Sequence, residues 1–176
     1  MKRICAGLPT SVGAFLLLSA MGGTLAKADI AILKGEGDGN SKAFYTSKMW
    51  NPAVAPNNQD GTANSVGANT DFVVCNNMKL QPPDEADDYV FGGKSLSIGA
   101  ADRSSGGIFK YKGNNRYISF ADVRLYKGSW EQHSNGWMGL EGDATVYSPA
   151  SDPFVFKFKE QYVNKLNFRF HGDKQL

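Results

Sequence analysis

Short apolar and aromatic runs, separated by glycine- and asparagine-rich turns, follow one another from residue 72 to residue 158. Most runs are four or five residues long, and many alternate apolar with polar side chains. The glycine content, 20 of 176 residues, fits a chain with many tight turns. Short strands at regular spacing, bounded by turn residues, predict an all-β fold. The sequence offers no amphipathic helix longer than two turns; the weak candidate is 160–166.

The turns decide between two all-β architectures. An antiparallel β-sandwich of the jelly-roll type would need tight hairpins, for which a two-residue Asn-Gly loop is the strongest signal. Asn135-Gly136 is the one such pair that we find, and the segment before it is not strand-like. The other gaps are longer and uneven, which favours a right-handed parallel β-helix, a solenoid in which each coil buries its inward residues against the next. The sandwich stays the alternative.

Four segments carry a resemblance to a known family: 91–99, which reads F-x-G-x-S-L-x-I-G, followed by 107–113, 118–125 and 139–146. They resemble the coils of bacterial autotransporter passenger proteins, and the likeness covers residues 89–158. The resemblance implies a parallel β-helix with a structural or adhesive role at the cell surface. Such proteins are usually many times longer, so it also implies a short member or a fragment of a longer passenger.

The first residues have the layout of a secretory signal peptide. Lys2 and Arg3 precede an apolar run at 12–21, and Ala26-Lys27-Ala28 fits the small-residue cleavage rule. The apolar run is about half as long as a membrane span requires. We therefore expect a signal peptide at 1–28, an irregular cap or lead-in at 29–70, a β-rich solenoid domain at 71–170, and a C-terminal tail at 171–176.

Charge and cysteine content exclude several functional classes. The formal net charge is only +2, so a strongly basic nucleic-acid binder is excluded, and no segment after the leader is apolar enough to span a membrane. Cleavage after Ala28 would remove Cys5 and leave Cys75 alone in an apolar run. We expect Cys75 to be a small buried hydrophobic residue rather than a nucleophile.

Acidic residues cluster after Pro82-Pro83, and their hard oxygen atoms could bind Ca²⁺. The spacing matches no calcium-binding loop, so a solvated acidic turn is the favoured interpretation and no cofactor is expected. The cluster is nevertheless the basis for one further alternative, a remnant of a polysaccharide lyase, because such lyases share the β-helix and use acidic Ca²⁺ ligands. The candidate ligands are Asp84, Glu85, Asp87 and Asp88.

Aromatic residues could form a platform on which sugar rings stack. The favoured interpretation is that they pack in the core, but Tyr126, Trp130 and Trp137 are candidate glycan contacts. His133 and His171, far apart in polar turns, are expected to lie on the surface.

These patterns predict a secreted, non-enzymatic structural or adhesive protein, extracellular or on the outer cell surface, with a cell-surface or glycan partner. The alternative is a carbohydrate-binding β-sandwich module.

Overall fold

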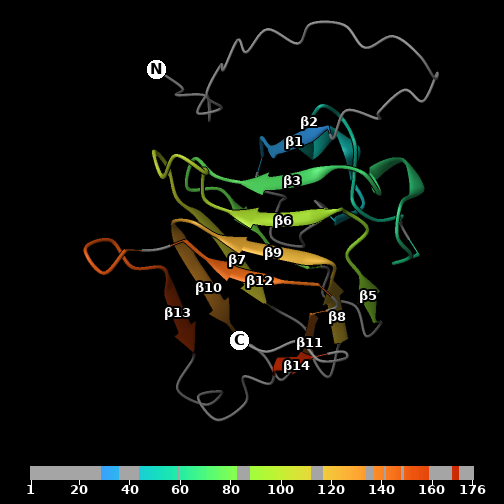
Figure 1. Ribbon diagram of the computed structural model, residues 1–176. Coiled ribbons are helices and arrows are strands. Elements are labelled where there is room, and N and C mark those ends of the chain that lie inside the picture. The colour runs from blue at the N-terminus through green and yellow to red at the C-terminus, as the bar shows by residue number, and fades with distance from the viewer. Residues whose placement is uncertain are drawn as a thin grey trace, which may run out of the picture.

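The computed structural model (Figure 1) describes residues 29–35, 44–58, 60–82, 88–111, 117–133, 137–140, 142–147, 149–158 and 168–170, and only the backbone at 137–140, 158 and 168–170. Strands dominate these residues, and the helical structure in them consists of single 3₁₀ turns, such as Ser47–Met49 and Ser65–Gly67. The all-β prediction is therefore confirmed. The predicted signal peptide at 1–28 and tail at 171–176 lie outside the described residues.

The described strands form three sheets. The six-stranded sheet has the order β12-β9-β6-β3-β1-β2 and contains β1 (Ile30–Leu33), β2 (Trp50–Asn51), β3 (Asp71–Val74), β6 (Ser95–Ile98), β9 (Asp122–Leu125) and β12 (Ala144–Val146). The β7 sheet has the order β13-β10-β7-β4 and contains β4 (Lys79–Leu80), β7 (Gly107–Tyr111), β10 (Gly128–Gln132) and β13 (Val155–Phe158). The β8 sheet has the order β14-β11-β8-β5 and contains β5 (Tyr89–Val90), β8 (Tyr117–Phe120), β11 (Trp137–Leu140) and β14 (Phe168–Phe170).

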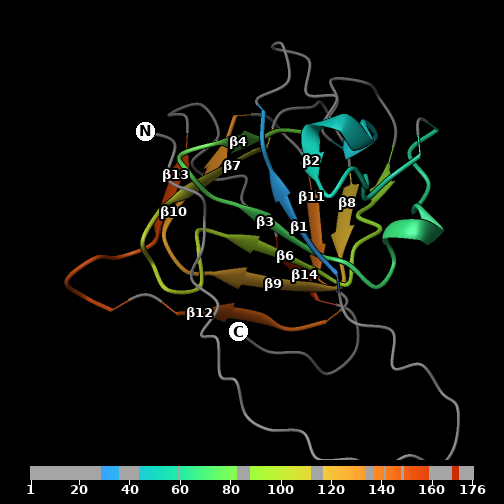
Figure 2. The ribbon, with the colours of Figure 1, turned by 90° about the horizontal axis from the view of Figure 1, so that it is seen from above.

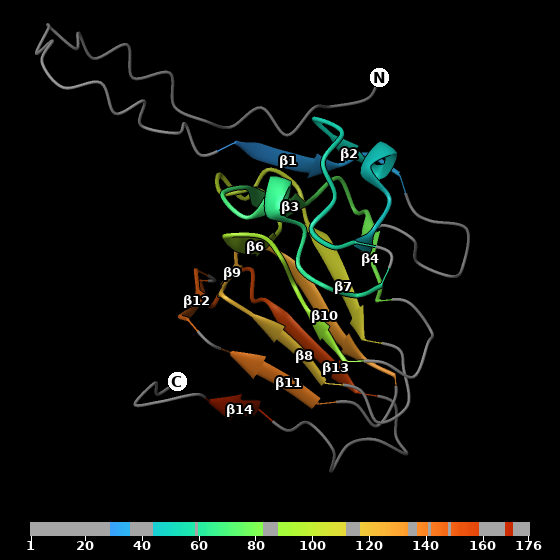
Figure 3. The same ribbon diagram turned by 90° about the vertical axis from the view of Figure 1, so that its right-hand side faces the viewer.

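Consecutive strands pass from one sheet to the next. The chain runs through β3, β4 and β5, one in each sheet, then through β6, β7 and β8, and it repeats this order to β14. In each sheet, strands from successive repeats of this order lie side by side (Figures 1 and 3) and pair in parallel. The exception among the described strands is β2, which is antiparallel to β1. The alternative of an antiparallel β-sandwich is therefore wrong, because adjacent strands are not joined as hairpins.

Residues 29–70 contribute more than the expected irregular lead-in. β1 pairs in parallel with β3 and extends the six-stranded sheet by one strand, and β2 then covers β1. The alternation in Ile30–Leu33 is too short to stand out in the sequence. Its burial pattern nevertheless matches that of β3, with every second residue buried.

The core consists of inward side chains that repeat in register from strand to strand. Seen along the stacking direction, the sheets surround one interior (Figure 2). Parallel pairing places chemically similar residues beside one another, so that a strand buries its apolar face against both neighbours. Two such columns are Ala31, Phe72, Leu96 and Val123 in the six-stranded sheet, and Leu80, Phe109 and Trp130 in the β7 sheet.

Aromatic rings connect these columns across the interior. The Phe109 and Trp130 ring centroids lie 4.0 Å apart, and both rings contact Phe120 of the β8 sheet at 5.7 and 5.8 Å. Rings in edge-to-face contact add stabilisation beyond the burial of their area. The aromatic content of the chain is therefore used largely in the core.

One corner of the structure requires glycine because backbones approach closely there. A Cβ atom on Gly107 would lie 1.9 Å from the carbonyl oxygen of Val74. The preceding residue, Gly106, has room, since a Cβ there would meet its nearest neighbour at 3.5 Å.

Gly107→Ala should therefore destabilise the protein by about 1–3 kcal/mol, because the backbone must shift to admit the methyl group. Gly106→Ala is the matched control and should change the free energy of unfolding by less than about 0.5 kcal/mol. Thermal unfolding of the two variants measures the difference, at about 2–4 °C per kcal/mol for a chain of this size. Equal melting temperatures would contradict the close approach.

Candidate functional site

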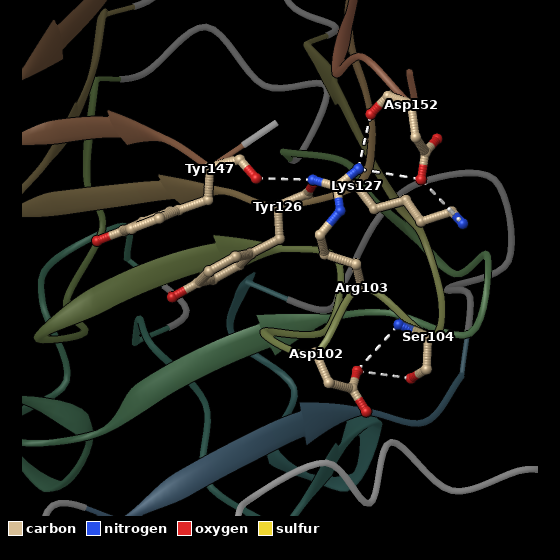
Figure 4. Close-up of polar contacts among 7 residues, drawn as sticks. All are labelled: Asp102, Arg103, Ser104, Tyr126, Lys127, Tyr147 and Asp152. Carbon is tan, nitrogen blue, oxygen red and sulfur yellow. Dashed lines mark hydrogen bonds and ion pairs between the residues drawn. The ribbon is translucent and has the colours of Figure 1, made fainter. Parts of the chain in front are cut away.

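Two tyrosines stack on the outside of the six-stranded sheet. Tyr126 follows β9 and Tyr147 follows β12, each one residue after an inward side chain, so that both rings point outward (Figure 4). Their ring centroids are 4.7 Å apart and the ring planes differ by 15°. Tyr147 is 48 % exposed. The parallel register of β9 and β12 produces this stack, because it places equivalent positions one strand spacing apart.

A charged pair lies on the same outer face. The Arg124 guanidinium is 3.7 Å from the Asp71 carboxylate, which also accepts a 2.6 Å hydrogen bond from the Ser95 hydroxyl. Burial raises the pKa of the Tyr126 hydroxyl, and neighbouring Tyr147 adds to this effect. The phenol therefore stays protonated at neutral pH and can donate a hydrogen bond. Aromatic faces beside fixed polar groups are a combination suited to binding a polar ligand with apolar faces.

The Arg103 side chain connects the two turns that carry Tyr126 and Tyr147 (Figure 4). It lies between β6 and β7 with φ of +60°, and its guanidinium donates to the backbone carbonyls of Tyr126 and of Tyr147, the latter at 2.7 Å. It also donates to the Asp152 carbonyl at 2.6 Å and pairs with the Asp152 carboxylate at 3.0 Å. One side chain thus holds the turns that follow β9 and β12, which carry the two tyrosines.

The surroundings of Arg103 are fixed by short-range polar contacts. Asp102 accepts hydrogen bonds from the backbone and hydroxyl of Ser104, which hold the pKa of the Asp102 carboxyl below its usual range. Hydrogen bonds from Lys127, 3.2 Å away, and from Arg103 likewise lower the pKa of Asp152. Both carboxylates therefore remain charged at neutral pH.

The candidate glycan contacts fall into three different places. Tyr126 lies on the outer face, as a binding role requires. Trp130 is 1 % exposed and packs on Phe109, because the inward register of β10 places it in the core. The favoured interpretation of core packing is therefore confirmed for Trp130, and its candidate contact with a glycan is wrong. The backbone of Trp137 belongs to β11, and its side chain lies outside the described residues.

The candidate calcium ligands are only partly described. Asp84, Glu85 and Asp87 lie outside the described residues. Asp88 is exposed and accepts a 2.9 Å hydrogen bond from the backbone amide of Tyr117. Among the residues that the structure describes, no group of three or more His, Cys, Asp or Glu side chains could hold a metal ion.

Two other sequence expectations concern cysteine and histidine. Cys75 is fully buried, which confirms the expectation of a small buried residue, and in the full chain it is engaged in a disulfide. The expectation of a lone thiol concerned the chain after cleavage at Ala28 and stays a prediction; Cys5 lies outside the described residues. His133 is partly buried, with its Nε2 atom 3.3 Å from the Glu131 carboxylate. His171 lies outside the described residues.

Sequence reasoning missed Arg103. The segment around it is a polar turn, and the available signal was Asp102 two residues before Ser104, the spacing of an Asx turn. Such a turn does not reveal that its arginine reaches two later turns, since those contacts join residues far apart in the chain.

No family model, no curated protein and no solved structure matches this chain. The resemblance to autotransporter passengers therefore stays a prediction from the residues. Within the described part of the chain, no helix is both long enough and apolar enough to cross a membrane.

Arg103→Ala should destabilise the protein by about 1–3 kcal/mol, because three backbone carbonyls and a carboxylate lose a charged donor. Alanine keeps the Cβ atom, so the strain of the positive φ is unchanged. Arg124→Ala is the matched control: it removes an arginine from one ion pair with 3.7 Å separation and should cost less than about 1 kcal/mol. Urea unfolding compares them, and equal losses would contradict the role of Arg103 in joining the turns.

Proposed function

We propose that this chain is a secreted, non-enzymatic structural or adhesive protein of the cell surface, built as a short right-handed parallel β-helix like an autotransporter passenger. The observation that carries the proposal is the in-register parallel pairing of strands that pass in turn through three sheets. A crossover between parallel strands is almost always right-handed, which favours that hand for the coils.

The outer face supports a role in contact rather than catalysis. A stack of coils presents an extended ladder of side chains, and affinity arises along this ladder instead of in one pocket. A serine, a glutamate and a histidine lie together on β10 and just after it, but they are arranged unlike a hydrolytic triad. Glu131 lies between Ser129 and His133 and contacts each at 3.3 Å, whereas a triad requires the histidine to contact the serine.

A second candidate role, carbohydrate binding, is favoured by the Tyr126–Tyr147 stack. The sandwich fold expected for such a module is absent from the described strands, but the stacked tyrosines provide an aromatic face of the kind on which sugar rings pack. The exposed ring of Tyr147 offers the contact surface, and the Arg124–Asp71 pair supplies polar groups on the same sheet.

Export is tested by producing the full chain in a bacterial host with an intact secretory system. We expect the protein outside the cytoplasm with Asp29 as its first residue, since the leader has the layout that signal peptidase recognises. Intact mass and N-terminal sequencing measure the processed end. A Leu17→Arg variant, which breaks the apolar run, should stay inside the cell. An unprocessed wild-type protein in the cytoplasm would contradict the proposal.

Carbohydrate binding is tested on a glycan array with the mature protein. Tyr147→Ala should weaken binding about tenfold, the equivalent of losing one ring contact. Tyr147→Phe should bind almost as well as wild type, because it keeps the ring face. Val66→Ala, at another exposed apolar side chain, is the control for unrelated surface changes. An array without any bound glycan would refute this second role and leave the structural one.

A further inference from the structure

A hydrogen-bond donor and an acceptor of opposite charge meet over the middle of the six-stranded sheet. There β6 lies between β3 and β9 (Figure 1). Its outward residues, which alternate with the core residues of the strand, are the small side chains Ser95 and Ser97. They leave room for Arg124 of β9 to extend across β6 toward Asp71 of β3. The guanidinium and the carboxylate therefore lie together on the outer face that carries the tyrosine stack.

The described residues leave hydrogen-bonding capacity unused in both of these groups. The Arg124 guanidinium has several N–H donors, and its ion-pair partner in the described part of the chain, Asp71, is 3.7 Å away, too far for a hydrogen bond. The Asp71 carboxylate accepts a 2.6 Å hydrogen bond from Ser95, which leaves it further lone pairs. The Arg124 side chain is 32 % exposed and that of Asp71 is 16 % exposed, so a ligand can reach both.

The same two groups lie within electrostatic range of the tyrosine stack. Arg124 precedes Tyr126 by two residues, so both side chains point to the same side of the sheet. Burial and then Tyr147 raise the pKa of the Tyr126 hydroxyl; Arg124 lowers this pKa, and Asp71 raises it. An exposed aromatic face, a guanidinium and a carboxylate are therefore grouped in one region of the outer face.

The charges of this region disfavour an anionic ligand. The charged side chains on the strands of the six-stranded sheet are Asp71, Asp122 and Arg124. Asp122 is in register with the outward residue Ser95, and so is Asp71. Two carboxylates therefore accompany one guanidinium, and they would repel the acid group of a charged sugar. A hydroxyl group is both a donor and an acceptor, which matches a guanidinium beside a carboxylate.

We propose that Tyr147, Arg124 and Asp71 bind a neutral pyranose sugar that carries two adjacent hydroxyl groups. The apolar face of the sugar packs on the exposed ring of Tyr147. One hydroxyl accepts a hydrogen bond from Arg124, and its neighbour donates one to Asp71. This proposal rests on the carbohydrate-binding role proposed above and adds the class of sugar, neutral rather than acidic, together with the two residues that select it.

The test measures, by titration calorimetry, binding of the processed chain to oligosaccharides of glucose, mannose and galactose and to matched oligosaccharides of their uronic acids. We expect at least one neutral oligosaccharide to bind about tenfold more tightly than its uronic acid counterpart. Arg124→Lys should weaken this binding about tenfold, because lysine keeps the charge but lacks the planar fork of donors. Asp71→Asn should weaken it similarly and reduce the preference for the neutral sugar, because one carboxylate charge is removed.

Asp60→Asn is the matched control. The Asp60 carboxylate also accepts a 2.6 Å hydrogen bond from a hydroxyl, that of Thr62, but it lies in an exposed turn outside the sheet. This variant should bind like the wild type. Circular dichroism of each variant checks that the strands are retained.

Deoxy sugars provide a measurement on the wild-type protein that needs no folded variant. Removal of either of the two adjacent hydroxyls from the bound sugar should weaken binding about tenfold, because one charged group loses its partner. Tighter binding of the uronic acids, or neutral binding that Tyr147→Ala weakens but Arg124→Lys, Asp71→Asn and the deoxy sugars do not, would overturn this proposal and leave the carbohydrate-binding role. Binding to no member of the panel would overturn both.

Discussion

The parallel register of equivalent strands is the constraint on which the rest of this structure depends. It places Leu96 between Phe72 and Val123, and Phe109 beside Trp130, so that one apolar position repeats into a buried column. A shift of one residue in any strand would turn its apolar face outward. The close backbone approach at Gly107 and the aromatic contacts across the interior both require that register to be kept.

The same register explains what lies on the outside. Tyr126 and Tyr147 stack because each follows an equivalent inward residue of neighbouring strands. Arg103 reaches the turns that carry them because successive turns lie above one another at this corner. Parallel in-register pairing thus makes residues separated by tens of positions in the chain adjacent on the surface, which is the basis for the proposed contact role.

A stack of strands has two ends, and the two ends of this one differ. At one end a short antiparallel strand, β2, covers the core with Trp50; at the other, inward side chains such as Val146 remain accessible. Burying an apolar row is favourable in proportion to its area. The cover that β2 provides is therefore favourable at its end of the six-stranded sheet.

Glycine-punctuated runs were sufficient to predict an all-β fold, and the scarcity of hairpin turns was sufficient to favour parallel over antiparallel pairing. The candidate site was less predictable. Tyr126 and Trp130 looked alike as aromatic residues near turns, yet one lies outside and the other in the core. Tyr126 follows β9 and Trp130 lies in β10, and the direction in which each side chain points depends on how its strand pairs with its neighbours.

The sequence by itself determined where strands form and where the chain turns, because alternation, β-branching and glycine act over a few residues. Only the tertiary structure decided which runs pair, which rings stack, that Arg103 joins three turns, and which end of the sheet is covered. Those outcomes depend on contacts between residues far apart in the chain. Such contacts stabilise the fold only once the strands lie side by side.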